Sequence, residues 1–189
     1  MKDAFDDIGH CPDEWMARTD RLGLRLLRAA DAVPLREVTQ DGWVADLAAR
    51  SGDRTLSPWA IVLRDGGAIA GFCGFFVRPV KGITMGYGIV PEYRGRGLAT
   101  EAAAAVLDWA ERHGIDVYAS IRPPNPASVR VLEKIGMRLV DSYRDEDGQR
   151  DIYRRQQDRL DEALQQASVL AGRARRNTNP QPCDPQSVP

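Results

Sequence analysis

The sequence lacks the long hydrophobic runs that would place it in a membrane. Its longest uninterrupted apolar stretch, Ala102–Leu107, is far shorter than the ~20 residues that a membrane-spanning helix needs. The segment from Met1 to Asp7 has no apolar core of the kind that a secretory signal carries. Cysteine is also scarce, with only Cys11, Cys73 and Cys183, spaced widely. These absences predict a cytoplasmic protein with no membrane partner.

Metal ligands and excess charge are lacking too. The only histidines are His10 and His113, and no cysteine pair has zinc-site spacing, so no metal site is expected. Lys and Arg total 26 against 27 Asp and Glu, a formal net charge of −1. Without surplus positive charge to neutralise phosphates, the chain is not expected to bind nucleic acid, although Arg94–Gly97 and Arg173–Arg176 are locally basic.

The overall composition and the pattern of apolar residues are typical of a globular domain with both strands and helices. The chain has 189 residues, 43% hydrophobic and 28% charged, enough for a substantial core. Strands are predicted from short apolar stretches at residues 22–27, 59–64, 68–77, 83–90, 115–121, 138–143 and 150–154. Helices are predicted at 43–48, 98–113 and 126–135. Asn125-Pro126 provides a favoured start for the last of these, and Gly114 and Gly136 provide ends.

The predicted domain comprises residues 1–155, of which 1–19 form a poorly defined N-terminal segment. Leu160, Leu164, Ala167 and Ala171 predict an amphipathic C-terminal helix over 156–172. That helix could pack on the domain or pair two chains, which leaves a homodimer open. Residues 173–189 are rich in proline and poor in apolar residues, and they predict a flexible tail.

The loop Arg94-Gly95-Arg96-Gly97, between a predicted strand and the helix at 98–113, is the strongest candidate for a binding site. N–H groups at a helix start lack intrahelical partners, and the helix dipole adds about half a positive charge there. Gly95 and Gly97 let the backbone approach a phosphate closely. Arg94 and Arg96 add positive charge at the rim. The loop therefore predicts an anion site; the alternative is a plain turn with solvated arginines.

Two well-known phosphate motifs fit this loop poorly. A P-loop needs Lys and then Ser or Thr after its last glycine, where this chain has Leu98-Ala99. A dinucleotide fingerprint would need glycine at Thr100 and a parallel βαβ context, whereas antiparallel strands are predicted to come first.

A different family matches better. Arg94-x-x-Gly97-x-Ala99 fits the Q/R-x-x-G-x-G/A signature of the GNAT superfamily of acyl-CoA N-acyltransferases. The surrounding segment, 86–102, resembles the branch of ribosomal-protein-alanine N-acetyltransferases. A second block, Asn125–Met137, is similar to N-x-x-S-x-x-V-L-x-K-x-G-F. In element order the resemblance extends over 22–155.

The resemblance implies a mixed α/β (α+β) fold. This would be a GNAT-like twisted sheet of six to seven strands, with helices on both faces and a splayed cleft between the fourth and fifth strands. Acetyl-CoA would be the co-substrate and an amine the acceptor. The diphosphate of acetyl-CoA would lie on Arg94–Thr100 and its pantetheine along Gly88–Val90. A backbone N–H near Ile89 or Val90 would polarise the thioester. The residues expected to bind it are Gly88, Ile89, Val90, Arg94, Gly95, Arg96, Gly97, Leu98, Ala99, Thr100, Asn125 and Ser128.

The expected reaction is direct attack of a neutral amine on the thioester in a ternary complex. The family's tyrosine acid is replaced by Leu132, and its strand glutamate by Thr84. Ser128 is then the candidate partner of the leaving thiolate, unless it only satisfies helix N–H groups. Glu92 is a candidate base, and so are the carboxylates of 145–147 acting through water, although a solvated surface charge is the favoured interpretation of each.

Because Leu132 and Thr84 replace the family's tyrosine and glutamate, two hypotheses about function remain open. The chain acetylates a protein N-terminus or a small-molecule amine, or it is a degenerate acyl-CoA-binding or regulatory domain that has lost the chemistry. Neither the loops of residues 35–57 nor the terminal hairpin carries a signature that identifies the acceptor.

Overall fold

The computed structural model describes residues 15–49, 54–78 and 82–155. Two of the three cysteines, Cys11 and Cys183, lie outside the described residues. So do the predicted C-terminal helix at 156–172 and the predicted tail at 173–189.

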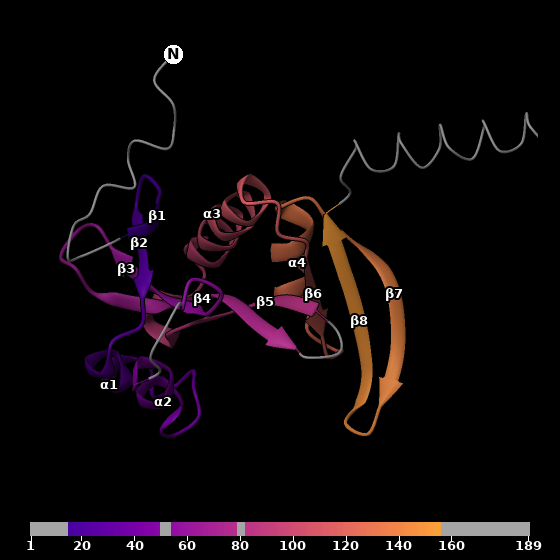
Figure 1. Cartoon of the computed structure of the whole chain (residues 1–189), viewed down its shortest axis with the longest axis horizontal. Helices are drawn as coiled ribbons and strands as arrows, with labels where there is room; N and C mark the ends of the chain where they lie inside the picture. The colour runs from indigo at the N-terminus through magenta and orange to yellow at the C-terminus, as the bar shows by residue number, and fades with distance from the viewer. Residues whose placement is uncertain (1–14, 50–53, 79–81, 156–189) are drawn as a thin grey trace, which may run out of the picture. The chain divides into compact units, whose positions relative to one another are not determined.

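One mixed sheet of eight strands forms the frame of the fold, in the order β1-β2-β3-β4-β5-β6-β8-β7 (Figure 1). The strands are β1 Trp15–Arg18, β2 Leu22–Leu26, β3 Pro58–Leu63, β4 Ile69–Arg78, β5 Gly82–Ile89, β6 Val117–Ile121, β7 Met137–Asp145 and β8 Gly148–Arg155. Every neighbouring pair is antiparallel except β5 and β6, which run parallel. A parallel pair needs a crossover connection, and α3 supplies it.

The sheet has one strand more than the six to seven expected. The additional strand, β1, lies in the segment that the sequence left poorly defined, and it pairs antiparallel with β2. A Cβ on Gly23 would stand 2.2 Å from the Trp15 ring, so this ring occupies the space that a side chain at residue 23 would fill. Glycine at this position therefore lets the tryptophan cover β2.

Helices cover both faces of the sheet, as expected. They are η1 Ala29–Asp31, α1 Ala32–Leu35, α2 Trp43–Ala49, η2 Pro91–Tyr93, α3 Leu98–Arg112 and α4 Pro126–Lys134. Successive side chains of β3 alternate between two hydrophobic clusters. Trp59 and Ile61 pack in the cluster of α3 and α4, whereas Ala60 and Val62 pack with α1 and α2. In Figure 1 the two helix pairs accordingly lie on opposite sides of the strands.

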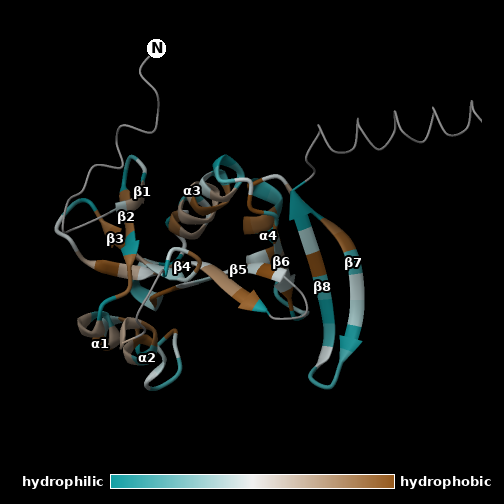
Figure 2. Ribbon diagram, viewed as in Figure 1, coloured by the Kyte–Doolittle hydropathy of each residue, from teal (hydrophilic) through white to brown (hydrophobic). Residues whose placement is uncertain are grey.

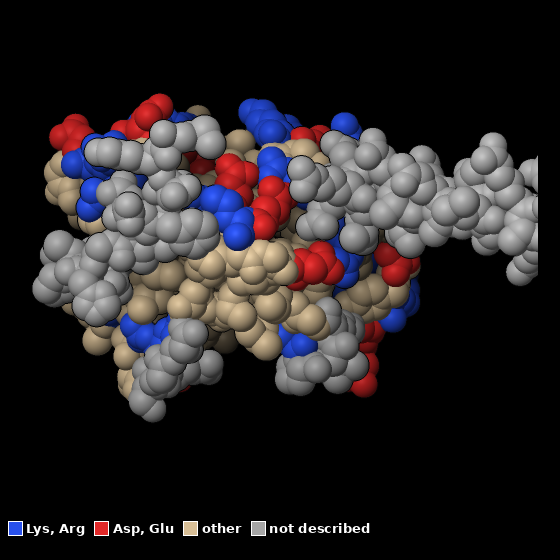
Figure 3. Space-filling model, turned by 45° about the horizontal axis from the view of Figure 1, so that its top comes forward, with Lys and Arg blue, Asp and Glu red and all other residues tan. Residues whose placement is uncertain are grey.

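The β7–β8 hairpin is the more hydrophilic end of the sheet. Figure 2 shows much teal along these two strands and more brown in the centre of the fold. Most side chains of β7 are exposed, including Leu139 and Val140. On the face drawn in Figure 3, acidic and basic side chains are interspersed, which suits a chain whose charges nearly balance.

Candidate functional site

The strands β5 and β6 part from each other midway along β5. Their pairing covers only three positions, Ile83–Met85 of β5 with Val117–Ala119 of β6. On its other side β5 stays paired with β4 as far as Ile89. Within the described residues, the β6-facing side of Gly86–Ile89 therefore has no strand partner; we call it the open edge of β5. This is the expected splay between the family's fourth and fifth strands.

Backbone groups of Tyr87 and Ile89 face the open edge. The N–H of Val90 donates to the carbonyl of Ala70 on β4 at 2.9 Å. Backbone polar groups alternate between the two sides of a strand, so those of Ile89 and Tyr87 point the other way. The carbonyl of Ile89 is indeed met from that side by Nε of Arg94 at 2.9 Å. Of the two donors expected for the thioester, Ile89 has its N–H on this side and Val90 does not.

The loop before α3 has the backbone geometry of an anion cradle. Gly95 and Gly97 are both left-handed, with φ of 75° and 79°, and Gly97 is the N-cap of α3. The first bond of the helix runs from the N–H of Glu101 to the carbonyl of Gly97 at 3.1 Å. The three preceding N–H groups, on Leu98, Ala99 and Thr100, therefore have no acceptor within the helix.

The two arginines of the loop carry charge and also donate hydrogen bonds to backbone carbonyls. Besides the bond of Arg94 to Ile89, the Nη2 of Arg96 donates to the carbonyl of Glu92 at 3.0 Å. The guanidinium of Arg96 also lies 5.5 Å from the centre of the Tyr93 ring. Both arginines are exposed, and each retains further N–H groups that an anion could reach.

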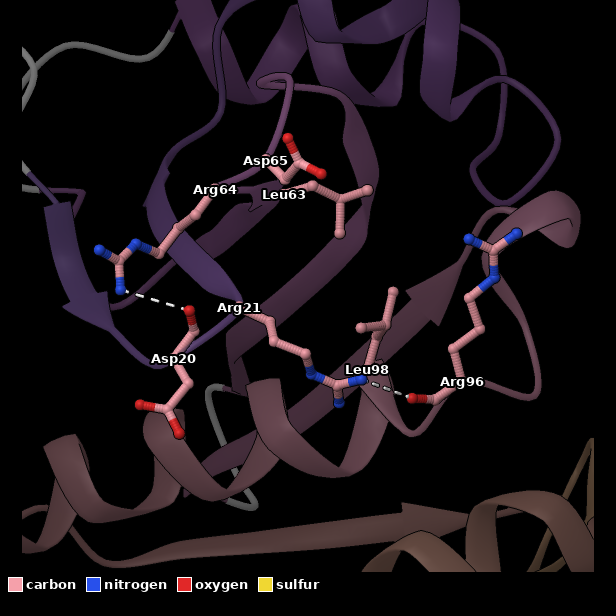
Figure 4. Close-up of a pocket in the computed structure, with 7 residues that line it drawn as sticks. All are labelled: Asp20, Arg21, Leu63, Arg64, Asp65, Arg96 and Leu98. Carbon is pink, nitrogen blue, oxygen red and sulfur yellow. Dashed lines mark hydrogen bonds between the residues drawn. The ribbon is translucent and has the colours of Figure 1, made fainter.

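A third arginine, which sequence reasoning missed, lies beside this loop. Arg21, in the turn between β1 and β2, donates through Nη1 to the carbonyl of Arg96 at 3.0 Å and pairs with Glu101 on α3. Figure 4 shows Arg21 reaching toward Arg96 across a pocket of about 630 Å³. The pocket is lined by Asp20, Arg21, Leu63, Arg64, Asp65, Arg96 and Leu98. No local pattern marks residue 21, because its partners lie 75 and 80 positions along the chain.

The start of α4 reaches toward the open edge. The Oδ1 of Asn125 accepts a hydrogen bond from the N–H of Ser128 at 3.1 Å, which is an N-cap, and Pro126 is the first helical residue. The hydroxyl of Tyr87 on β5 donates to the carbonyl of Ser128 at 3.1 Å. The structure therefore brings Asn125 and Ser128 together, and Tyr87 links them to the open edge.

Comparison with known proteins agrees with this geometry. A family described as "Acetyltransferase (GNAT) domain" matches residues 21–138, more than half of the chain. The chain belongs to the GNAT acetyltransferase family. That family uses acetyl-CoA as its acyl donor, and both the loop at 94–97 and the open edge lie within the matched residues.

Parts of the chain are similar to individual proteins from several bacteria. The "Uncharacterized protein YkkB" of Bacillus subtilis is 36% identical over 94 residues, which are 47% of this chain and 55% of that protein, so the chain spans about half of that relative's length. A crystal structure of an acetyltransferase from Agrobacterium tumefaciens is 26% identical, with a TM-score of 0.59, covering 74% of this chain and 93% of the other. A ribosomal-protein-S5-alanine acetyltransferase from Vibrio fischeri shares the fold at 16% identity and a TM-score of 0.53, covering 72% of this chain and 93% of the other.

The two positions at which many GNAT proteins are expected to have a tyrosine acid and a strand glutamate are buried here. The side chain of Leu132 is 1% exposed and belongs to the core, and Thr84 is 8% exposed. Leu132 has no group that can donate a proton, and Thr84 cannot act as a carboxylate base. Acid or base catalysis by this chain would therefore need other residues or water.

The acidic residues considered as candidate bases differ in their ion pairs and hydrogen bonds. Asp145 pairs with Arg150 at 3.1 Å, and Asp147 pairs with both Arg150 and Arg122, at 3.2 and 3.0 Å. These two carboxylates are thus committed to ion pairs at the tip of the β7–β8 hairpin. Glu92 is exposed in η2, where a hydrogen bond with its carboxylate raises the pKa of the Tyr93 hydroxyl.

Covalent and metal chemistry find no support in the described part of this GNAT chain. Burial raises the pKa of the Cys73 thiol far above its usual range, so this cysteine stays neutral and is a poor nucleophile. Within residues 15–49, 54–78 and 82–155, no cluster of His, Cys, Asp or Glu could hold a metal ion. Among the helices of those residues, none has the length and hydropathy to cross a membrane.

Proposed function

We propose that the chain is an N-acetyltransferase that moves an acetyl group from acetyl-CoA to a primary amine by direct attack in a ternary complex. The observation that carries the proposal is the juxtaposition of two features. The open edge of β5 leads, through Val90 and η2, directly into the glycine loop at the start of α3. A molecule with a diphosphate at one end and an extended amide chain at the other matches both features.

Binding follows from backbone chemistry. The N–H groups of Leu98, Ala99 and Thr100, with the positive end of the α3 dipole, favour the diphosphate. The pantetheine amides add to the open edge as an extra strand would, through the polar groups of Tyr87 and Ile89. Asn125 and Ser128, at the start of α4, lie on the other side of the pantetheine.

Acetyl transfer then needs a donor for the oxyanion, a proton for the leaving thiolate and a base for the amine. An N–H of the open edge, with Ile89 the candidate, stabilises the oxyanion as the amine nitrogen attacks the carbonyl carbon. As the C–S bond breaks, the hydroxyl of Ser128 gives its proton to the thiolate and regains one from solvent. The proton lost by the amine leaves through water, with Glu92 as the candidate base.

The acceptor we propose is a protein N-terminus or a small-molecule amine. Support comes from the family and from the resemblance of 86–102 to the ribosomal-protein branch, whose Vibrio fischeri member shares the fold. A hollow of about 220 Å³ lined by Tyr118, Asp141, Tyr143, Ile152 and Arg154 is a candidate place for the acceptor.

Release of free thiol from acetyl-CoA, measured over a panel of amines and N-terminal peptides, tests the proposal. We expect thiol release that depends on the acceptor, together with a product heavier by one acetyl group. Tight binding of coenzyme A without thiol release for any acceptor would favour the acyl-CoA-binding domain instead. Absence of binding would overturn both readings.

A further inference from the structure

Glu101 stands in the first turn of α3, next to the loop that is proposed to hold the diphosphate. Its carboxylate accepts hydrogen bonds from Thr19 Oγ1 at 2.5 Å, from the N–H of Arg21 at 3.2 Å and from Nε of Arg21 at 2.7 Å. Nη2 of Arg21 completes an ion pair with it at 2.5 Å. Burial alone would raise the pKa of this carboxyl, but the bonds from Thr19 and Arg21 outweigh it and lower the pKa. Glu101 is therefore ionised at neutral pH.

A carboxylate in this turn has two opposite effects. It interacts well with the positive end of the helix dipole, which stabilises α3 in the absence of ligand. It would also repel a diphosphate bound a few ångströms away at the same helix end. Arg21 offsets that repulsion, because its guanidinium lies directly on the carboxylate.

Arg21 also fixes the orientation of a loop peptide. Its Nη1 holds the carbonyl of Arg96 at 3.0 Å, and the same guanidinium would lie 3.6 Å from a Cβ on Gly97. In a trans peptide the carbonyl and the following N–H point in opposite directions. Holding the Arg96 carbonyl toward Arg21 therefore turns the N–H of Gly97 away from Arg21. Figure 4 shows this bond from the β1–β2 turn to the loop.

We propose that Arg21 is a positioning residue for the diphosphate, acting through the Arg96 carbonyl and the Glu101 carboxylate. Arg21 neutralises the Glu101 carboxylate and orients the Arg96 carbonyl, so that the loop presents N–H groups and net positive potential to the ligand. The inference rests on the proposed function, since it assigns Arg21 to the same coenzyme site.

Arg64 provides a matched control. It lines the same pocket and is also exposed, and its Nη1 donates to the carbonyls of Thr19 and Asp20 in the same turn. Arg64→Gln and Arg21→Gln thus each remove one positive charge from the same pocket. Of the two, Arg21 is bonded to Arg96 and Glu101.

The test combines steady-state kinetics with calorimetry on the full-length chain. We expect Arg21→Gln to raise KM for acetyl-CoA, and Kd for coenzyme A, by about tenfold with kcat within about twofold, and Arg64→Gln to change neither. Adding Glu101→Gln to Arg21→Gln should recover part of the lost affinity, because no carboxylate is then left to repel the ligand. Arg21→Lys should lie between Arg21→Gln and wild type.

Other outcomes would overturn the inference. Equal affinity in Arg21→Gln and Arg64→Gln would show that the loop does not depend on residue 21. Failure of the double variant to recover would mean that Glu101 is not the intermediary. A loss seen with coenzyme A but not with 3′-dephospho-coenzyme A would place Arg21 on the 3′-phosphate itself. Absence of coenzyme A binding by the wild type would instead count against the proposed function, which keeps the two failures distinct.

Discussion

The hydroxyl of Tyr87 on β5 and the backbone carbonyl of Ser128 on α4 are 3.1 Å apart and hydrogen-bonded. This bond ties the open edge of β5 to the first turn of the helix beyond it. Burial raises the pKa of Tyr87 to about 12, so the phenol remains a proton donor at neutral pH. A side chain thus links β5 to α4 next to the open edge.

Removal of that hydroxyl should change how stability depends on pH. The pKa of Tyr87 is raised from 10.0 to about 12, so its contribution to folding is complete below pH 10 and is lost as pH rises toward 12. We expect Tyr87→Phe to lower the unfolding free energy by about 1 kcal/mol at pH 8 and to show a smaller decline from pH 10 to 12 than wild type. Urea unfolding at both ends of this range measures it; identical declines would contradict the assignment.

Ser128→Ala tests the proposed thiolate partner. The substitution leaves the backbone carbonyl that Tyr87 bonds and the N–H that Asn125 caps, so the local fold should persist. We expect kcat to fall by about a hundredfold with KM for acetyl-CoA changed little, as for loss of a proton donor. Thiol release at saturating acetyl-CoA measures it. Turnover equal to that of wild type would remove this role from the hydroxyl.

Two substitutions at Asn125 separate its capping role from its proposed contact with pantetheine. Aspartate is as good an N-cap as asparagine, whereas alanine cannot accept the bond from the Ser128 N–H. We expect Asn125→Ala to cost about 1 kcal/mol of stability and Asn125→Asp almost nothing. If the amide also donates to pantetheine, both variants should bind coenzyme A more weakly. Thermal melts and calorimetry report the two effects separately, and unchanged affinity in Asn125→Asp would restrict the residue to capping.

Glutamate placed at either end of α3 distinguishes ligand binding from backbone strain. Gly97 and Gly114 are both left-handed, with φ of 79° and 66°, so a side chain costs about 1 kcal/mol at each. We expect Gly97→Glu to abolish coenzyme A binding, because it adds a carboxylate beside Arg21 at the end of α3 where the diphosphate is proposed to bind. We expect Gly114→Glu to bind coenzyme A normally. Calorimetry on both variants, after circular dichroism has confirmed folding, makes the comparison. Loss of binding in both would mean that strain alone is responsible.

Local sequence patterns predicted the helices whose ends and apolar faces are determined by nearby residues. The apolar period from Leu98 to Ala110 and the glycine after His113 predicted α3, and Asn125-Pro126 predicted the start of α4; both are confirmed. Strand β1 was missed because four residues are too few to show a period, and its stability comes from pairing with β2.

The contacts of the candidate site could be predicted where neighbouring residues make them, and could not be predicted where two distant segments meet. The glycine loop is local, so its residues could be read directly from the sequence. Arg21 meets Glu101 across 80 positions, and Tyr87 meets Ser128 across 41. No periodicity or motif records such contacts, because they depend on how the sheet brings the strands together.

The link between the β1–β2 turn and α3 has a consequence for the order in which binding competence arises during folding. Thr19 and Arg21 bond to Glu101 across 82 and 80 positions of the chain. Closing so long a loop costs conformational entropy that the formation of a local helix does not cost. The glycine turn can adopt its shape early, from nearby residues alone. If Arg21 positions the loop as proposed, its contribution to binding arises only after the β1–β2 hairpin has docked on α3, so coenzyme A would select chains in which this docking is complete.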